Sequence, residues 1–281
     1  MKESAIKELL TRAVERIYPS AEFLESRLKN GEQLSLYLGI DPTGPTLHLG
    51  HIIPLLKLAQ FQALGHKIIL LIGDFTGMIG DPTDKTATRK RLTRAEVLEN
   101  AKLYKEQASR IIQFGGKNPA EIRHNSEWLG KMSFEDVLEL CSQITHSQAV
   151  KRDMFQKRIS EGKDLYIHEF LYPLMQGYDS VAMDVDGEVG GNDQSFNMLV
   201  GRDLMKKIKN KEKFVVATKL LTDGAGAKMG KTEGNTVALT DSAADMFGKV
   251  MSWPDSMILA GFELCTRVPV EEIKKTQSIL N

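Results

Sequence analysis

Two histidines stand three residues apart in the stretch GIDPTGPTLHLGH, residues 39–51, where a long apolar run begins. The run predicts a helix, and residues at i and i+3 share one face of a helix, so His48 and His51 can donate to a single phosphate. The N–H groups and the dipole of a helix N-terminus also attract phosphate. Gly50 would let a nucleotide lie close to the backbone. The alternative is that both histidines are ordinary capping residues.

A zinc site at these histidines is less well supported, because no third His, Cys or carboxylate stands at ligand spacing.

A second stretch whose residues could take part in catalysis is KMGKT, which begins at Lys228 and lies in the glycine-rich segment 222–235. Two lysines in such a loop could close over a triphosphate. A solvated surface loop has the same composition and remains the alternative.

The third stretch is YPLMQGYD, residues 172–179, which predicts a helix. Tyr172, Gln176 and Asp179 stand at i, i+4 and i+7 and therefore share one face. A tyrosine, an amide and a carboxylate beside apolar residues suit a polar ligand better than a core, although a solvated stripe is the alternative. Pro173 would bend this helix and weaken the alignment.

The elements that must position these residues follow an α/β alternation. Segments 34–40 and 66–74 predict strands, and the second is apolar on both faces, which is typical of the interior of a parallel sheet. Between them lies a crossover helix. Further strands are expected near 181–185 and at 213–221, and helices at about 93–113, from 133, through 147–178 and at 193–207. Only helices are expected after the glycine-rich segment. Ligands of such sheets gather beyond the carboxyl ends of the strands.

Composition excludes several classes of protein. The formal charge is zero, with 37 basic and 37 acidic residues among 281, so the chain is not a generally basic nucleic-acid-binding protein. Cys141 and Cys265 are expected to be buried thiols of a reducing compartment. The apolar run at 68–72 is too short to span a bilayer, and residues 1–20 are expected to form an amphipathic helix rather than a targeting peptide. We expect a cytoplasmic protein without membrane contact.

HLGH and KMGKT, in this order and on these elements, resemble the HIGH and KMSKS motifs of the class I aminoacyl-tRNA synthetases. Gly230 and Thr232 stand where that consensus has serines. The resemblance implies that His48, His51 and Thr43 act on the ATP phosphates, and that Lys228 and Lys231 close over the pyrophosphate. It also implies the same leaving-group role for Lys85 and Arg89, although a basic surface loop is the alternative there.

The 172–179 helix is similar to the tyrosine-binding helix of bacterial tyrosyl-tRNA synthetases. This resemblance implies that Tyr172 and Gln176 bind the amino group of tyrosine and that Asp179 takes the phenol proton. It assigns the remaining substrate contacts to a larger set: Tyr37 completes the phenol clamp, Asp81 holds the ammonium, Gln194 meets the carboxyl group, and Asn125 and Trp128 form the pocket wall. The ATP-binding residues it implies, besides Lys231 and Thr232, are Asp41, Gly50, Gly191 and Asp193.

The resemblance further implies a Rossmann-like catalytic domain at 1–224 with a helical insertion at about 126–166. Residues 225–281 would hold the KMSKS-type loop and the start of a helical domain, without the usual anticodon-binding and S4-like regions. The implied enzyme is a homodimeric tyrosine–tRNA ligase that uses Mg-ATP and tRNA(Tyr). It would have no protein-held metal and no tightly bound cofactor, because Mg²⁺ would ride on the phosphates.

A feature of the sequence argues against each of four other functions. A tryptophan-specific sister enzyme is disfavoured by the tyrosine-binding set, and a nucleotidyltransferase would not explain the polar helix face. A non-catalytic RNA-binding relative would have no need of the histidines and Lys231. The motifs argue against a dehydrogenase, because no G-x-G-x-x-G follows the first strand.

Overall fold

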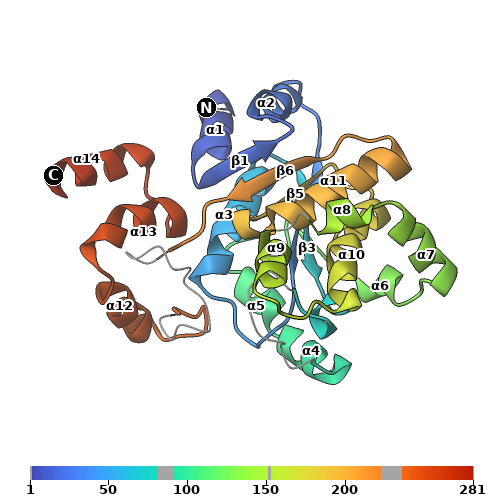
Figure 1. Ribbon diagram of the computed structural model, residues 1–281. Helices are drawn as coiled ribbons and strands as arrows, with labels where there is room; N and C mark the ends of the chain where they lie inside the picture. Colours follow the sequence, from blue (N-terminus) through green and yellow to red (C-terminus); the bar gives the residue numbers. More distant parts are fainter. Residues whose placement is uncertain (1, 82–91, 151–152, 223–235, 281) are drawn as a thin grey trace.

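The computed structural model describes residues 2–81, 92–150, 153–222 and 236–280. Its centre is a six-stranded sheet in the order β1-β6-β5-β2-β3-β4, with helices on both faces (Figure 1). Five strands are parallel and β1 joins the edge antiparallel to β6. The strands are β1 (Val14–Tyr18), β2 (Ser35–Ile40), β3 (Lys67–Ile72), β4 (Glu121–His124), β5 (Gly187–Gly191) and β6 (Phe214–Thr218). The α/β fold with a Rossmann-like sheet is confirmed.

The helices divide between the two faces and the ends of the sheet. They are α1 (Lys2–Thr11), α2 (Ala21–Lys29), α3 (Leu49–Ala63), α4 (Arg94–Ala101), α5 (Tyr104–Ala108), α6 (Ser126–Leu129), α7 (Phe134–Ser142), α8 (His146–Ala149), α9 (Asp153–Ser160), α10 (Ile167–Met183), α11 (Ser195–Lys209), α12 (Ala243–Met251), α13 (Ile258–Cys265) and α14 (Val270–Leu280). Figure 1 shows α12, α13 and α14 together at one end and α7 at the other.

The alternation of side chains along β2 and β3 separates two cores, as expected for strands buried on both faces. Leu36 and Leu70 belong to the main core, which contains apolar residues of α1, α2, α3 and α5. Tyr37 and Ile69, one residue along each strand, lie on the opposite face in a cluster with Val185. α10 and α11 pack closely together and cover that second face. Residues on this second face therefore lie under α10, which carries the polar stripe.

Two of the predicted elements are wrong: the helix over residues 1–20 and the strand near 181–185. The N-terminal helix ends at Thr11, because Ala13 adopts a positive φ of 56°, and the residues after it form β1. The strand expected near 181–185 falls instead at Gly187–Gly191, since α10 continues to Met183. The glycine-rich strand GEVGG has little β propensity of its own. A Cβ at Gly187 would lie 2.1 Å from the ring of Phe214, so close packing against β6 requires the glycine there.

Two further details differ from the sequence prediction. The helix expected over about 93–113 is broken into α4 and α5, although its predicted capping box of Thr93 and Glu96 is present. The short edge strand β4 was not predicted. The capping box of Ser133 and Asp136, the crossover helix and the strand at 213–221 are confirmed. Within the described residues, no helix is both long and apolar enough to cross a membrane.

The C-terminal helices are fixed to the N-terminal segment by one buried arginine. Arg12 donates hydrogen bonds to four carbonyl groups at the end of α13 and just after it, at distances of 2.8 to 3.1 Å. Lys219, which follows β6, pairs with Glu263 of α13 at 2.9 Å. The glycine-rich segment 222–235 is therefore bounded by two anchored parts of the chain.

Candidate active site

The candidate site lies at the carboxyl edge of the parallel sheet. Strand β2 pairs with β3 on one side and with β5 on the other, so the strand order reverses at β2. Such a reversal is where ligands of open α/β sheets bind. Asp41 follows β2, Thr76 follows β3, Asn125 follows β4 and Gly191 ends β5. The topology thus brings together residues that lie far apart in the sequence.

The two histidines form the N-terminal cap of α3. His48 is the N-cap, and its Nδ1 accepts from the backbone N–H of Gly50 at 3.1 Å. His51 Nδ1 accepts from the backbone N–H of His48 at 3.2 Å, and the two ring centroids are 4.0 Å apart. The capping interpretation is therefore confirmed for Nδ1. It does not exclude phosphate binding, because a neutral ring that accepts at Nδ1 carries its proton at Nε2.

The chain that follows the KMGKT motif returns to these histidines. Leu49 donates its backbone N–H to Val237 at 3.1 Å, and His48 forms an isolated antiparallel bridge with Ala238. The five predicted residues Lys85, Arg89, Lys228, Lys231 and Thr232 lie outside the described residues. The two ends of the motif's segment are nevertheless tied to the sheet and to the start of α3.

Asp41 is held by two hydroxyl groups. Tyr172 Oη donates to Oδ2 at 2.8 Å, and Thr76 Oγ1 donates to Oδ1 at 2.7 Å. A Cβ at Gly73 would lie 1.9 Å from Oδ1, so only glycine leaves room for this carboxylate. Thr43, predicted to act on phosphate, donates its backbone N–H to the Asp41 carbonyl at 2.8 Å. The turn after β2 is thereby closed around Asp41.

Hydrogen-bond acceptors surround Tyr172 and Gln176, the two N-terminal residues of the α10 stripe. Gln194 Nε2 donates to Asp81 Oδ2 at 2.6 Å. Burial raises the pKa of Tyr172 well above its usual range, and the nearby Asp41 and Asp81 carboxylates raise it further. Gln176 donates to Glu188 at 3.2 Å, whereas its Oε1 is buried and has no hydrogen-bond partner among the described residues. Carboxylates and an unused amide oxygen are the acceptors that an ammonium group needs.

Asp179 lies at the buried end of the same stripe, with 2% of its surface exposed. It accepts from Trp128 Nε1 at 2.8 Å and from Asn125 Nδ2 at 3.3 Å. Burial raises the pKa of Asp179 well above its usual range, while the Trp128 and Asn125 bonds lower it. Asn125 is itself fixed, because Phe75 N–H donates to its Oδ1 at 2.9 Å. Asp179 is thus a buried acceptor whose direction is set by two donors.

The predicted clamp of Tyr37 and Asp179 is not joined by a hydrogen bond. Tyr37 is fully buried, and its hydroxyl lies 3.0 Å from Ser180 Oγ instead. Burial raises the pKa of Tyr37, and the Glu188 and Asp179 carboxylates raise it further, which places both acidic groups in its surroundings. The Tyr37 hydroxyl therefore has a protein partner that the sequence analysis did not identify.

Gly191 and Asp193, which are predicted to bind ATP, lie at the end of β5 and in the turn that follows it. Asp193 Oδ1 lies 2.4 Å from the position of a Cβ on Gly191, so the backbone and this carboxylate are closely packed. Gln194 follows in the same turn and reaches Asp81, as described above. No group of three His, Cys, Asp or Glu side chains suited to a metal ion occurs in the described part of the chain.

Five residues at the site were missed by the sequence analysis: Gly73, Thr76, Ser180, Glu188 and Lys213. Two of them carried a signal, because Glu188 interrupts the glycine strand and Lys213 opens an otherwise apolar strand. A charged residue inside a buried strand is rare unless it is paired. The others have no sequence signal, since their role depends only on which elements pack together.

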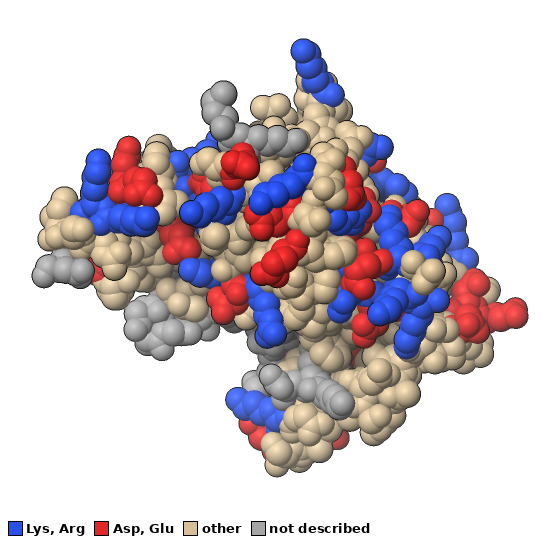
Figure 2. Space-filling view, turned by 90° about the horizontal axis from the view of Figure 1, so that it is seen from above, with Lys and Arg blue, Asp and Glu red and all other residues tan. Residues whose placement is uncertain are grey.

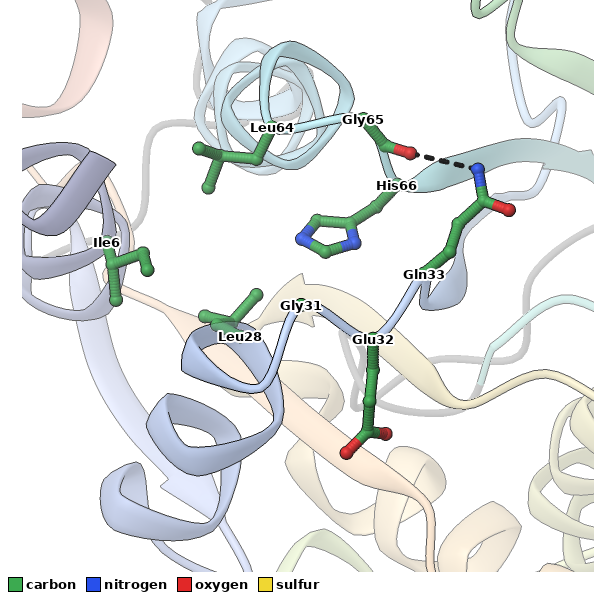
Figure 3. A pocket seen from close by; sticks show the side chains of 8 residues that line it. All are labelled: Ile6, Leu28, Gly31, Glu32, Gln33, Leu64, Gly65 and His66. Atoms are coloured by element: carbon green, nitrogen blue, oxygen red, sulfur yellow. Dashed lines mark hydrogen bonds between the residues drawn. The ribbon is translucent and has the colours of Figure 1, made fainter. Parts of the chain in front are cut away.

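A hollow at the opposite edge of the sheet is separate from this site. Figure 3 shows its lining, which consists of Ile6 of α1, Leu28 of α2 and the two loops that lead into β2 and β3, residues 31–33 and 64–66. Gln33 donates to the Gly65 carbonyl at 3.2 Å, and His66 Nδ1 accepts from the Leu34 N–H at 3.2 Å. The polar side chains there hold together the loop before β2 and the loop before β3.

The chain is similar in sequence to known proteins over most of its length. The family described as "tRNA synthetases class I (W and Y)" matches residues 29–281. The tyrosine–tRNA ligase of Carboxydothermus hydrogenoformans is 47% identical over 275 residues, covering 95% of this chain and 66% of that protein. The tyrosine–tRNA ligase of Geobacter metallireducens is 45% identical and covers 100% of this chain and 68% of that protein. The chain thus spans about two thirds of the length of these relatives.

Solved structures agree on the fold. A C-terminally truncated mitochondrial tyrosyl-tRNA synthetase of Coccidioides posadasii superposes with a TM-score of 0.77 at 25% identity, covering 97% of this chain and 80% of that one. The corresponding protein of Aspergillus nidulans gives a TM-score of 0.81 at 23% identity, covering 98% and 83%.

Proposed function

The chain belongs to the class I tRNA synthetases of the tryptophan and tyrosine group, and we propose that it is the catalytic part of a tyrosine–tRNA ligase. In this proposal it activates L-tyrosine with Mg-ATP to tyrosyl-adenylate and pyrophosphate, and then transfers tyrosine to tRNA(Tyr). The observation that carries the choice of tyrosine is the polar face of α10. It offers acceptors for an ammonium group near Tyr172 and a buried carboxylate, Asp179, for a hydroxyl group.

Catalysis rests on positioning and on charge stabilisation. The tyrosine carboxylate is already ionised and attacks the α-phosphorus directly, so no general base is required. Asp41, Asp81 and the free Oε1 of Gln176 would hold the ammonium group. The Nε2 side of His48 and His51 would donate to the phosphate, while their Nδ1 atoms keep the rings in place. Mg²⁺ enters as part of the ATP substrate.

Lys228 and Lys231, together with Lys85 and Arg89, are proposed to neutralise the pyrophosphate. Gly50, Asp193, Gly191 and Thr232 are proposed to contact ATP. These roles rest on the motifs in the sequence. For the described residues among them, support comes from their position at the carboxyl edge of the sheet.

We also propose a homodimer through the helical insertion at about 126–166. The support is an apolar surface on α7, where Phe134 is 78% exposed and Leu138 is 55% exposed. Ile167, at the start of α10, is also 78% exposed. Exposed apolar side chains that gather in one region mark protein interfaces more often than isolated ones do.

The face shown in Figure 2 has no large basic patch that would bind tRNA. Figure 2 shows Lys and Arg interspersed with Asp and Glu over the face that it presents. Basic residues cluster in the segment 151–158, but Arg158 is buried and paired with Glu169, so it is not available to contact RNA. Lys157 is exposed, whereas Lys151 and Arg152 lie outside the described residues. We propose weak and strongly salt-dependent tRNA binding.

The test is amino-acid-dependent exchange of pyrophosphate into ATP. We expect exchange with tyrosine and little with tryptophan or phenylalanine. Exchange with tryptophan instead would support the sister specificity. A chain that catalyses no exchange but binds tRNA would support a non-catalytic RNA-binding relative.

A further inference from the structure

A fully buried ion pair lies behind the tyrosine pocket. Lys213, just before β6, donates to Glu188 of β5, and both side chains are at most 3% exposed. Removing two charges from water costs several kcal/mol per ion, so such a pair is rarely a net stabiliser compared with apolar residues of similar size. A role in positioning would explain why it is present.

The pair connects Gln176 of the α10 stripe, through Ser180 of the same helix, with Tyr37 of β2. Glu188 accepts from Gln176 at 3.2 Å through its other oxygen. Lys213 also donates to Ser180 Oγ at 2.7 Å, and Ser180 is 3.0 Å from the Tyr37 hydroxyl. The network therefore begins at a residue proposed to bind the ammonium group and ends at one proposed to bind the phenol.

The chemistry of the groups sets the direction of these bonds. An ammonium group has three donors and no acceptor, so Ser180 accepts from Lys213. Ser180 Oγ also lies 3.0 Å from Tyr37 Oη, and the charged donor already on Ser180 Oγ favours the orientation in which Ser180 donates to Tyr37. Tyr37 then acts as acceptor toward Ser180, which leaves its hydroxyl hydrogen for another group.

Glu188 would otherwise compete for that hydrogen. Burial raises the pKa of the Tyr37 phenol most, and Glu188 raises it further both through its charge and as an acceptor for the Tyr37 hydroxyl. Lys213 and Gln176 each occupy one oxygen of Glu188. The positive charge of Lys213 and the bond from Gln176 offset part of the negative charge of Glu188, so this carboxylate draws the Tyr37 hydrogen less strongly than an unpaired one would.

Two glycines at the contact of α10 and α11 make room for this arrangement. A Cβ on Gly201 would lie 2.7 Å from Lys213 Nζ and 3.0 Å from Ser180 Oγ. A Cβ on Gly177 would lie 3.1 Å from the Gly201 backbone nitrogen. The close approach of the helices lets the lysine reach Ser180 from the sheet.

We propose that Lys213 is a positioning residue for tyrosine selection, which acts through Ser180 to turn the hydroxyl hydrogen of Tyr37 toward the phenol oxygen of the substrate. The substrate phenol then accepts from Tyr37 and donates to Asp179. Phenylalanine would leave both groups unpaired, and unpaired buried groups are the source of strong discrimination. This inference rests on the proposed function.

The test measures kcat/KM for tyrosine and phenylalanine in pyrophosphate exchange. Ser180→Ala cuts the link and keeps the ion pair, and we expect the tyrosine value to fall about five- to tenfold with the phenylalanine value unchanged. The double variant Lys213→Met/Glu188→Gln removes both charges together and should lower the same ratio. Lys211→Met is the matched control, because this lysine pairs with Asp184 and Asp186 on the surface side.

A double-mutant cycle separates positioning from a general packing effect. In the Tyr37→Phe background there is no hydroxyl to orient, so Ser180→Ala should cause no further change in the ratio. An equal loss for both amino acids, or an undiminished effect in the Tyr37→Phe background, would overturn the proposal. A wild-type chain that prefers tyrosine while Ser180→Ala leaves the ratio intact overturns the inference alone. A wild-type chain that does not activate tyrosine overturns the proposed function as well.

Discussion

At the scale of single residues, the candidate site depends on groups whose direction is fixed before any ligand arrives. Asp179 receives two hydrogen bonds, from Trp128 and Asn125, and Asp41 receives two from Tyr172 and Thr76. Holding acceptors in one direction reduces the reorganisation that a substrate must otherwise cause. Substitutions that preserve volume but exchange an acceptor for a donor should therefore be more damaging than their size suggests.

Asp179→Asn tests this expectation. The amide would present NH₂ to Trp128 or Asn125, both of which donate to Asp179, or to the substrate hydroxyl. We expect kcat/KM for tyrosine to fall by the equivalent of about 2–3 kcal/mol, while phenylalanine is affected less. Pyrophosphate exchange with both amino acids measures this. Asp184→Asn, at the left-handed C-cap of the same helix, is the matched control, and equal effects of the two substitutions would contradict the role of Asp179.

At the scale of elements, the C-terminal helix α13 is attached to the rest of the molecule by its contact with α3 and by hydrogen bonds from Arg12. α13 meets α3, and the end of α13 is held by Arg12 from the N-terminal segment. The free carbonyl groups at a helix C-terminus attract a cation and need donors. Arg12 satisfies several of them at once, so it joins the two ends of the chain.

Arg12→Met should therefore loosen the C-terminal helices. The substitution keeps an apolar stem but leaves four carbonyl groups without their donor. We expect a loss of roughly 2–4 kcal/mol in the free energy of unfolding, with faster hydrogen exchange concentrated in α13 and α14. Arg16→Met, on the exposed side of β1, is the control. Unchanged exchange in α13 would show that Arg12 does not hold this element.

At the scale of the whole molecule, two properties follow from burial and exposure. Lys57 is 2% exposed and donates to Leu9 and Arg12 carbonyls and to Gln60, all at 2.7 Å. Burial lowers its pKa to about 7. At the other end of the molecule, α7 exposes apolar residues that a second copy could cover.

The stability of the molecule should rise with pH because of Lys57. The folded state loses the Lys57 proton near pH 7, whereas the unfolded chain keeps it until about pH 10.4. Between these values the unfolded state binds more protons, so the free energy of unfolding increases with pH. Lys57→Met should remove this increase, which urea unfolding at pH 7 and pH 9.5 would measure. Parallel changes in wild type, Lys57→Met and the surface control Lys7→Met would contradict it.

The association state of the molecule tests the apolar surface on α7. We expect wild type to sediment as a dimer at micromolar concentration and Phe134→Asp to shift the equilibrium strongly toward monomer, because a charge would be buried in the interface. Phe247→Asp changes another largely exposed phenylalanine, on α12, and is the control. Dissociation by the control alone would move the interface to the other end of the molecule.

The sequence by itself determined the helices and strands with a strong apolar period. It also determined which residues lie on the same face of such an element. The two-sided strands β2 and β3, the histidine cap of α3 and the common face of Tyr172, Gln176 and Asp179 all follow from local spacing. The motifs also indicated the family. These features are readable because each depends on neighbours within a few residues.

Only the tertiary structure decided which distant groups meet. Strand β5 was placed wrongly because its glycines carry no apolar period, and β1 because its pairing with β6 lies about 200 residues away along the chain. The Tyr37 hydroxyl meets Ser180, and Lys213 reaches Ser180 across a contact between two helices. Such contacts depend on the packing of whole elements, because the position of each side chain is set by layers that no local pattern specifies.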